Sequence, residues 1–363
     1  MPDNLKRDLS DDILEKALSG VRITPLEALE IYRSADFIKV MTAARTVRSR
    51  MNNPAVVTYT LFRIVNYTNV CTADCSFCSF HCLPDDAAAR TLTLEEILEK
   101  MREAVVTRGA RQLFLQGGVN PAIPFDYYCG VLRAVKKELG TDIHIRAFSP
   151  SEISGMARQT GKPVREIIRI LKDAGMDSVP GAGAEILSDR VRTVLSPRKI
   201  SVAEWVRVME TCFEEGLPGS ANIVIGSIET PEEIIEHLRI IRDLQDRTGG
   251  LLAFIPWTFQ RQTDKFPIRN VATREYLKLL GLCRLFFDNI PHIEASVLGL
   301  GRSVGELALH AGADDISSVV IEENVLTSHG LSTETDAREF ICDSGFEPKR
   351  RNLLYQPEFG SQD

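Results

Sequence analysis

The chain contains 363 residues, of which 44% are apolar and 26% charged, and its formal net charge is −7. This composition belongs to globular proteins and excludes wholesale disorder and fibrous structure, while the acidic balance makes nucleic acids and membrane surfaces poor partners. Its apolar runs fall short of the roughly 18 residues that a membrane helix needs, and its first residues lack the apolar core of a signal peptide. We therefore expect a cytoplasmic protein whose eight cysteines are thiols or metal ligands rather than disulfides.

Two stretches in the first 50 residues, at 10–20 and 24–35, have helical periodicity and predict an N-terminal helical cover over residues 1–50. From residue 51 onward, short apolar strand-like runs alternate with amphipathic helical runs. Helix starts are marked at Thr93, Ser201 and Thr230, each followed three residues later by Glu. The strand-like runs are Val57–Val65, Gln112–Leu115, Ile143–Ala147, Ser178–Val179, Asn222–Ile225, Leu252–Ile255, His292–Val297 and Ile316–Ile321.

Eight strand–helix repeats predict an α/β fold, a (β/α)8 TIM-type barrel over residues 51–345 with the N-terminal helical extension outside it. A doubly wound open sheet is the competing arrangement, and it would require a reversal of strand order. Residues 346–363 are mostly polar, and we expect them to form a C-terminal tail that frays. In a parallel barrel the chemistry lies on the loops that follow the strands, so those loops carry the functional prediction.

Half of the cysteines crowd into the loop after the first strand. Cys71, Cys75 and Cys78 supply three thiolates, which are ligands for iron–sulfur clusters and for zinc. A zinc site would take Cys82 or His81 as its fourth ligand, whereas a cubane cluster with three protein ligands would leave one iron open for a small chelating ligand. The remaining cysteines, which we expect to be buried core thiols, are Cys129, Cys212, Cys283 and Cys342.

The Cys-x3-Cys-x2-Cys spacing after the first strand, with Phe77 just before the third cysteine, resembles the radical S-adenosylmethionine (SAM) enzymes. The resemblance implies a [4Fe-4S] cluster held by the three cysteines, with SAM on the fourth iron and a 5′-deoxyadenosyl radical as its product. Two of that family's motifs are altered, since Val119 replaces an acidic residue and Asn222 replaces a glycine. The positions that the resemblance assigns to SAM are Phe77, Gln116, Gly117, Gly118, Ser149, Glu185, Arg192 and Gly226.

Further runs resemble one subgroup of that family, which comprises the dehypoxanthine futalosine cyclases of menaquinone biosynthesis, the aminofutalosine synthases and the two FO synthase halves. The matching runs span roughly residues 20–355, and IPWTFQ together with AFSPSEI points most to the cyclases. Two substrate-side positions depart from the cyclase pattern. His81-Cys82 stands where Tyr-Arg is usual, and residues 261–264 (RQTD) replace Pro-x-Asn-Thr.

The cyclase resemblance implies that the radical takes the C4′ hydrogen of the substrate ribose, and that the carbon radical then closes on the benzoate ring. A proton and an electron leave as the ring regains aromaticity, so a base is required. Trp257 and Phe259 offer apolar walls. The candidates for the base are Asp315, Glu322 and His81, and those for binding the substrate carboxylate are Thr258, Gln260 and Arg261.

Most of these residues also have a structural interpretation. Asp315 would cap backbone groups, Glu322 would pair with a surface arginine, His81 would pack on its loop, and Glu185 and Arg192 would form surface salt bridges. The expected partners are a nucleoside-like small molecule and a reducing electron donor such as flavodoxin or ferredoxin. The rival functions are an FO synthase half or an aminofutalosine synthase-like radical enzyme and, from another class, a zinc-stabilised non-catalytic barrel that binds a ligand.

Overall fold

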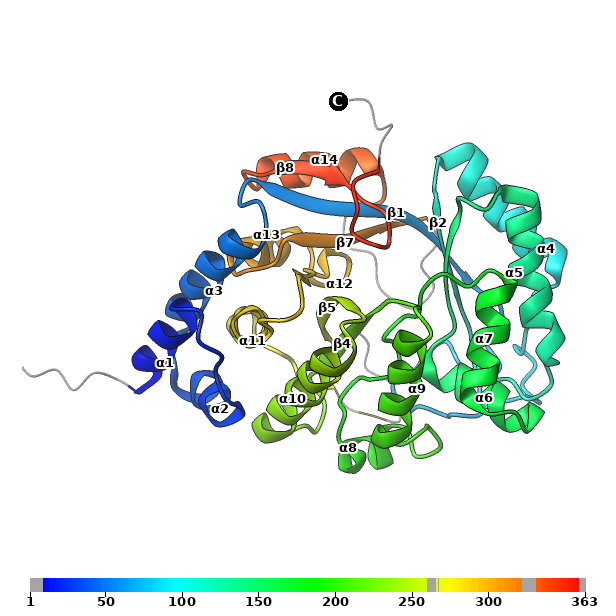
Figure 1. Ribbon diagram of the computed structural model, residues 1–363, viewed down its shortest axis with the longest axis horizontal. Helices are drawn as coiled ribbons and strands as arrows, with labels where there is room; N and C mark the ends of the chain where they lie inside the picture. Colours follow the sequence, from blue (N-terminus) through cyan, green and yellow to red (C-terminus); the bar gives the residue numbers. More distant parts are fainter. Residues whose placement is uncertain (1–8, 260–265, 267, 322–330, 359–363) are drawn as a thin grey trace, which may run out of the picture.

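The structure, a computed structural model, describes residues 9–259, 266, 268–321 and 331–358 (Figure 1). Parallel pairing joins one run of strands in the order β3-β2-β1-β7 and another in the order β4-β5-β6. The strands are β1 (Val56–Asn66), β2 (Gln112–Gln116), β3 (His144–Ala147), β4 (Gly219–Ile225), β5 (Leu251–Thr258), β6 (His292–Ile293), β7 (Asp315–Val320) and β8 (Glu347–Arg350).

Single parallel bridges close these two runs into a ring. Ser178 pairs with Arg146 and Val179 pairs with Gly219, so residues 178–179 form a short strand between β3 and β4. Glu294 pairs with Asp315, which joins β6 to β7. Neighbours in the ring follow chain order throughout the described residues, which is the connectivity of a (β/α)8 barrel rather than of a doubly wound sheet. The predicted barrel is confirmed, and each predicted strand overlaps a strand or bridge of the ring.

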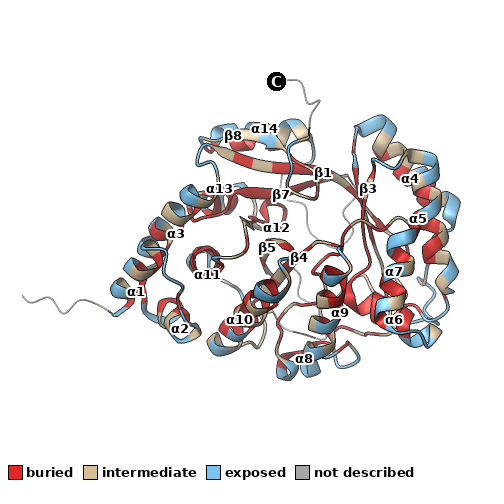
Figure 2. Cartoon of the chain, in the orientation of Figure 1, coloured by how far each residue is buried: buried red, intermediate tan, exposed pale blue. Residues whose placement is uncertain are grey.

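Helices surround the strands, and their buried faces turn toward the sheet (Figure 2). Thr93 and Thr230 form the reciprocal capping boxes that their sequences predict. At Ser201 only half of the box forms, because the Glu204 carboxylate bonds to the Ser154 hydroxyl instead. The helices around the barrel are α4 (Leu94–Arg102), continued by a π-helical turn (Glu103–Thr107), α5 (Phe125–Leu139), α6 (Pro150–Thr160), α7 (Val164–Ala174), α8 (Asp189–Leu195), α9 (Val202–Glu214), α10 (Pro231–Thr248), α11 (Thr273–Phe286), α12 (Val297–Leu300), α13 (Arg302–His310) and α14 (Glu334–Asp343).

The N-terminal helices α1 (Leu9–Leu18), α2 (Pro25–Ser34) and α3 (Phe37–Met51) lie outside the ring. Helix α3 packs on α11 and α13, and α2 packs on α10, so the three helices add a layer beside one part of the helical shell (Figure 1). Cys129, Cys212 and Cys283 are buried as expected. Cys342 is exposed, so the prediction of a core thiol is wrong there.

The C-terminal segment does not fray as expected, at least as far as Glu358. Strand β8 pairs in parallel with the start of β1, beside residues 56–59. Beyond it, the Leu353 amide donates to Gln112 Oε1 at the start of β2, and the Tyr355 ring stacks on His292 at 4.3 Å. Because these partners lie at the amino ends of barrel strands, residues 351–355 form a floor under that end of the barrel. No helix in the described part of the chain is long and apolar enough to cross a membrane.

Candidate active site

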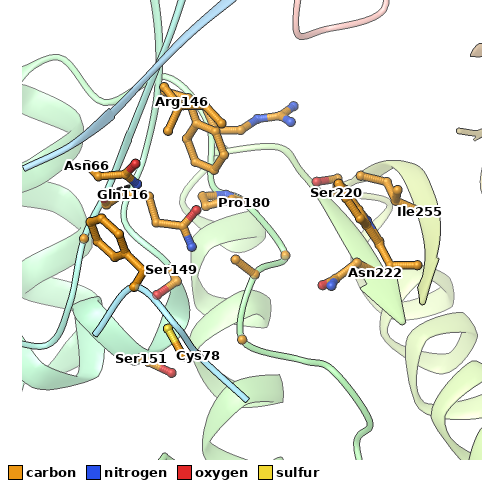
Figure 3. A pocket seen from close by; sticks show the side chains of 18 of the residues that line it. Asn66, Cys78, Gln116, Arg146, Ser149, Ser151, Pro180, Ser220, Asn222 and Ile255 are labelled. Carbon is orange, nitrogen blue, oxygen red and sulfur yellow. Dashed lines mark hydrogen bonds between the residues drawn. The ribbon is translucent and has the colours of Figure 1, made fainter. Parts of the chain in front are cut away.

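A cavity of about 400 Å³ occupies the barrel interior (Figure 3). Its wall includes residues of β1 to β5 and β7, Glu294 directly after β6, the loop that carries the cysteines and the loop around residues 180–185. Arg351 and Leu353 line it as well, so the C-terminal floor faces the same space. The cavity therefore connects the carboxyl ends of the strands, where a barrel places its chemistry, with a polar floor.

The three clustered thiols of Cys71, Cys75 and Cys78 all line this cavity. The Cys71 amide donates to the Cys82 carbonyl at 3.0 Å, which closes the loop on itself. The amide and hydroxyl of Ser76 both donate to the Leu195 carbonyl, which ties the loop to the end of α8. Burial raises the pKa of the Cys75 and Cys78 thiols.

His81 and Cys82 stabilise this loop. His81 Nδ1 lies 2.7 Å from the Cys78 carbonyl oxygen and Nε2 lies 3.2 Å from an Asp74 carboxylate oxygen, so both ring nitrogens are engaged. The Cys82 thiol accepts from the Asn69 amide at 3.3 Å. His81 lines the cavity, but these contacts favour the interpretation that it packs on its loop over the predicted role as a base.

Gly118 allows the cysteine loop to approach the end of β2. A Cβ on Gly118 would lie 2.1 Å from the Val70 carbonyl oxygen and 2.7 Å from Cys71 Cβ, so only glycine fits there. Beside it, the Val119 amide points at Cys71 Sγ at 3.4 Å. Gly117 packs against the Tyr67 ring, where a Cβ would lie 2.7 Å from the nearest carbon. Gln116, Gly117 and Gly118 all line the cavity, as their predicted positions require.

Ser149 lines the cavity and also begins helix α6 as its N-cap. Its amide donates to Glu152 Oε2 at 2.7 Å, and Glu152 Oε1 accepts from the Tyr67 hydroxyl at 2.6 Å and from the Gly117 amide at 3.0 Å. Burial raises the pKa of Glu152, although these donors oppose the shift. Glu152 thus connects the glycine turn (Gly117–Gly118) to the start of α6. Its position in the sequence does not reveal this role.

Glu185 is not a surface residue. Lys199 Nζ lies 2.8 Å from Glu185 Oε2, with the two side chains 8% and 15% exposed, and both residues line the cavity. Burial alone would lower the pKa of Lys199, but the Glu185 carboxylate and the Cys75 thiol hold it above its ordinary value. The ammonium also lies 5.7 Å from the Phe77 ring centroid, and that ring packs on Phe259 at 5.1 Å. Lys199 was missed because nothing in its local sequence marks it.

Two predicted SAM contacts lie away from the cavity. The Arg192 guanidinium donates to the carbonyls of Gly183 and Ala184 at 2.9 and 3.1 Å, and to that of Ile200. Arg192 therefore shapes the loop behind Glu185 and, unlike the position predicted for a SAM contact, does not line the cavity. Gly226 does not line the cavity either, since its amide donates to Glu229 Oε1 at 2.7 Å in the turn after β4.

Asp315 is buried behind the cavity wall rather than in it. It accepts from the Thr58 hydroxyl at 2.5 Å, from Arg351 Nη2 at 2.9 Å and from the Ser317 amide at 2.5 Å. Burial raises its pKa to about 6 although Arg351 opposes the shift. Because these donors occupy both carboxylate oxygens, Asp315 anchors the floor, and its contacts favour a structural role over the predicted role as a base.

The other predicted base and the predicted carboxylate donors fall outside the cavity or outside the described residues. Thr258 ends β5 beside Ile225 and does not line the cavity. Trp257 does line it. Glu322, Gln260 and Arg261 lie outside the described residues.

The cavity also contains polar side chains that the motifs did not indicate. Arg146 and Glu294 line it. Arg146 lies in the predicted strand Ile143–Ala147 and Glu294 in the predicted strand His292–Val297, and a charged residue within a predicted strand is a signal that could have found them. Several buried polar atoms of its wall have no hydrogen-bond partner in the described structure: Thr60 Oγ1, Ser151 Oγ, Asn222 Oδ1 and Ser296 Oγ. Unpaired polar atoms in a buried wall are costly, so the wall is suited to a polar ligand.

Three thiols on one loop, at the carboxyl ends of parallel barrel strands and facing a polar cavity, define the class of protein. Residues 65–241 match the radical SAM superfamily, and residues 248–362 match the CofH/MqnC C-terminal region. The chain belongs to the radical SAM superfamily and is an enzyme. Membership of this superfamily implies a [4Fe-4S] cluster and SAM.

Curated relatives place the chain within that superfamily. It is 40% identical to the cyclic dehypoxanthine futalosine synthase of Streptomyces coelicolor, over 97% of this chain and 89% of that protein. It is 34% identical to the 5-amino-6-(D-ribitylamino)uracil–L-tyrosine 4-hydroxyphenyl transferase 1 of Methanosarcina mazei, over 96% of this chain and 94% of that protein. The hydrogenase maturase HydG has the same fold, with a TM-score of 0.73 at 18% identity over 96% of this chain and 76% of that chain.

Proposed function

We propose that Cys71, Cys75 and Cys78 hold the [4Fe-4S] cluster. Within the described residues, no three His, Cys, Asp or Glu side chains converge closely enough to hold a single metal ion. A cubane cluster can take three protein thiolates on one loop, whereas a structural zinc ion takes four ligands, so the three thiols suit a cluster better than a zinc ion. Of the two alternative fourth zinc ligands, His81 has both ring nitrogens engaged elsewhere, and the Cys82 thiol accepts from the Asn69 side-chain amide.

SAM would lie against the glycine turn and the Glu185–Lys199 pair. Gly117 and Gly118 bring the backbone to the cavity edge beside Cys71, and the ion pair offers one carboxylate and one ammonium on the same wall. Asn222 Oδ1 is a buried acceptor without a partner in the described structure. It is therefore suited to accept from an adenine amino group or a ribose hydroxyl. Bound in this way, SAM would supply a 5′-deoxyadenosyl radical inside a closed barrel.

The reaction that we propose is that of a dehypoxanthine futalosine cyclase, in menaquinone biosynthesis. The C4′ hydrogen of the substrate ribose would pass to the 5′-deoxyadenosyl radical that bound SAM supplies, and a bond would form between C4′ and the benzoate ring. Loss of one proton and one electron restores the aromatic ring. That electron balances the one consumed in cleaving SAM, so the net reaction converts one SAM to methionine and 5′-deoxyadenosine and releases one proton.

Glu294 is the residue that we propose to accept this proton. Among the described residues, the carboxylates that line the cavity are Glu185 and Glu294, and Glu185 is paired with Lys199 near the cysteine loop. Glu294 Oε1 accepts from the Tyr355 hydroxyl and from Arg351 Nη2 at 3.2 Å. These contacts hold the carboxylate in place at the floor, where it remains exposed to the cavity.

One observation supports the cyclase most directly, namely 40% identity to a cyclic dehypoxanthine futalosine synthase over nearly the whole chain. Transfer of a tyrosine-derived fragment to a ribitylaminouracil is the second candidate, because a relative with that activity is 34% identical over a similar length. Both candidates use the same cofactors, so only the substrate separates them.

An anaerobic assay with reconstituted enzyme, SAM and a chemical reductant tests the proposal. With dehypoxanthine futalosine, we expect 5′-deoxyadenosine and cyclised product in equal amounts. Formation of 5′-deoxyadenosine without cyclised product would exclude the cyclase activity and leave the radical chemistry intact. Cys75→Ala should abolish cluster absorbance and both products, whereas Cys129→Ala, at a buried cysteine on α5, should retain the cluster.

A further inference from the structure

Arg146 is a buried cation that points into the cavity. It is 7% exposed, and Figure 3 shows its guanidinium extending from β3 across the interior, toward the side where Ser220 and Asn222 line the wall. Its hydrogen bonds are long, from Nε to Ser178 Oγ at 3.4 Å and from Nη2 to the Leu353 carbonyl at 3.3 Å. Within the described residues no carboxylate forms an ion pair with it.

Arg351, the other arginine that lines the cavity, does have carboxylate partners. Arg351 donates to both oxygens of Asp315, at 2.5 and 2.9 Å, and also reaches Glu294. Since Glu294 already accepts from Arg351 and Tyr355, the floor carboxylates are engaged and Arg146 is left over. A buried charge without a partner is strongly unfavourable, which indicates that the protein keeps Arg146 for a ligand.

The residue beside Arg146 indicates what kind of ligand this is. Phe114 of β2 is the register partner of Arg146, so the two side chains project from adjacent strands on the same face of the sheet. Both line the cavity, and Phe114 packs edge-to-face on Phe62 at 5.9 Å. A guanidinium next to an aromatic wall is suited to a carboxylate carried on, or close to, an aromatic ring.

We propose that Arg146 binds the substrate carboxylate, which for the cyclase is the benzoate group of dehypoxanthine futalosine; this identification of the ligand rests on the proposed function. The Nη1–Nη2 end of the guanidinium allows a bidentate contact, and the benzoate ring lies against Phe114. Arg146 thereby takes the role that the sequence assigned to Thr258, Gln260 or Arg261. It also places the ring at the floor, near the Glu294 carboxylate.

Equilibrium binding tests this role without turnover. Cluster-loaded enzyme with SAM and no reductant is titrated anaerobically with two pairs of ligands, each a carboxylic acid and its amide. The first pair is dehypoxanthine futalosine and its carboxamide, and the second is L-tyrosine and tyrosinamide. We expect the wild-type enzyme to prefer dehypoxanthine futalosine over its carboxamide by about ten- to hundred-fold, as charge-assisted hydrogen bonds allow. Arg146→Gln should lose that preference. The matched control Arg133→Gln, at an exposed position on α5, should keep it.

The outcomes separate this proposal from the proposed function. A preference for the acid of the tyrosine pair alone, lost in Arg146→Gln, would support Arg146 as the carboxylate-binding residue and overturn the cyclase assignment. A preference that survives in Arg146→Gln, or no acid preference in the wild-type enzyme, would overturn the role of Arg146. Thermal unfolding without substrate shows whether Arg146→Gln destabilises the fold rather than removing a contact with the ligand. Because Arg146→Gln removes an unpaired buried charge, its melting temperature should equal or exceed that of the wild type.

Discussion

Replacing Gly118 with alanine tests whether close packing of the β2 turn on the cysteine loop is what shapes the cluster site. The added Cβ would lie 2.1 Å from the Val70 carbonyl oxygen and 2.7 Å from Cys71 Cβ. The first of these is a backbone atom and the second is fixed directly to the backbone, so the clash is relieved only by moving the loop. Overpacking of this kind costs about 1–3 kcal/mol in free energy of unfolding.

The displaced loop should also lose its metal. Cys71 is the first proposed ligand, and it directly follows the carbonyl that Gly118→Ala would push away. We expect Gly118→Ala to unfold at lower urea concentration than the wild type and to hold much less iron after anaerobic reconstitution. The assay is urea denaturation followed by far-UV circular dichroism, together with iron and sulfide content per chain.

Gly130→Ala is the matched control. Gly130 lies inside helix α5, and an added Cβ there has no neighbouring atom within 4 Å. Because glycine is a poor helix former, this change should stabilise the protein by about 1 kcal/mol and leave the iron content unchanged. Wild-type stability and iron content in Gly118→Ala would refute the reasoning. A loss of iron in Gly130→Ala would show that the assay reports general fragility rather than loop geometry.

Other substitutions test the remaining parts of the site. Lys199→Met leaves the buried Glu185 carboxylate without its partner, so the free energy of unfolding should fall by about 3–5 kcal/mol, and adding Glu185→Gln should recover part of it in urea titrations. Leu353→Ala should cost about 2–5 kcal/mol because this floor residue is 1% exposed; an unchanged urea midpoint would contradict the floor. Arg190 lowers the pKa of Glu233 from 4.5 to about 2, so this carboxylate stabilises the fold above pH 4.5. The wild type should therefore melt at a higher temperature than Glu233→Gln at pH 4.5, and this difference should decrease as the pH falls to 2. A constant difference would refute this account.

The barrel and its cysteine loop could be predicted because their signals are local. Most barrel strands are apolar runs between turns, and the residues on the loops that follow the strands meet at one end once the ring closes. Cys71, Cys75 and Cys78 lie within eight residues of one another, so any fold that preserves the loop brings them near one another. The glycine turn was predicted for ligand contact, and the structure adds that Gly118 is required by the protein's own packing.

The sequence was least informative about polar side chains whose partners are set by tertiary structure. The Arg192 guanidinium donates to backbone carbonyls of two loops, and Lys199 pairs with a carboxylate 14 residues away. Sequence periodicity predicts which face of a helix is buried. It does not predict which group a long lysine or arginine side chain contacts. The side chain of Asp315, a predicted base, bonds instead to Arg351, 36 residues further along the chain.

The floor of the cavity shows why a polar segment at the end of a sequence is easily misread. Residues after Phe346 look solvated, because lysines, arginines and glutamates in a tail usually are. Buried Glu294 and Asp315 form the bridge that joins β6 to β7, and the C-terminal segment supplies Arg351 as the counter-ion of both carboxylates. Only after this pairing is known does Arg146 stand out, among the described residues of the cavity wall, as a cation without a carboxylate partner. The contacts that make the tail part of the core are therefore also the reason that we propose Arg146 as the site for an anionic substrate.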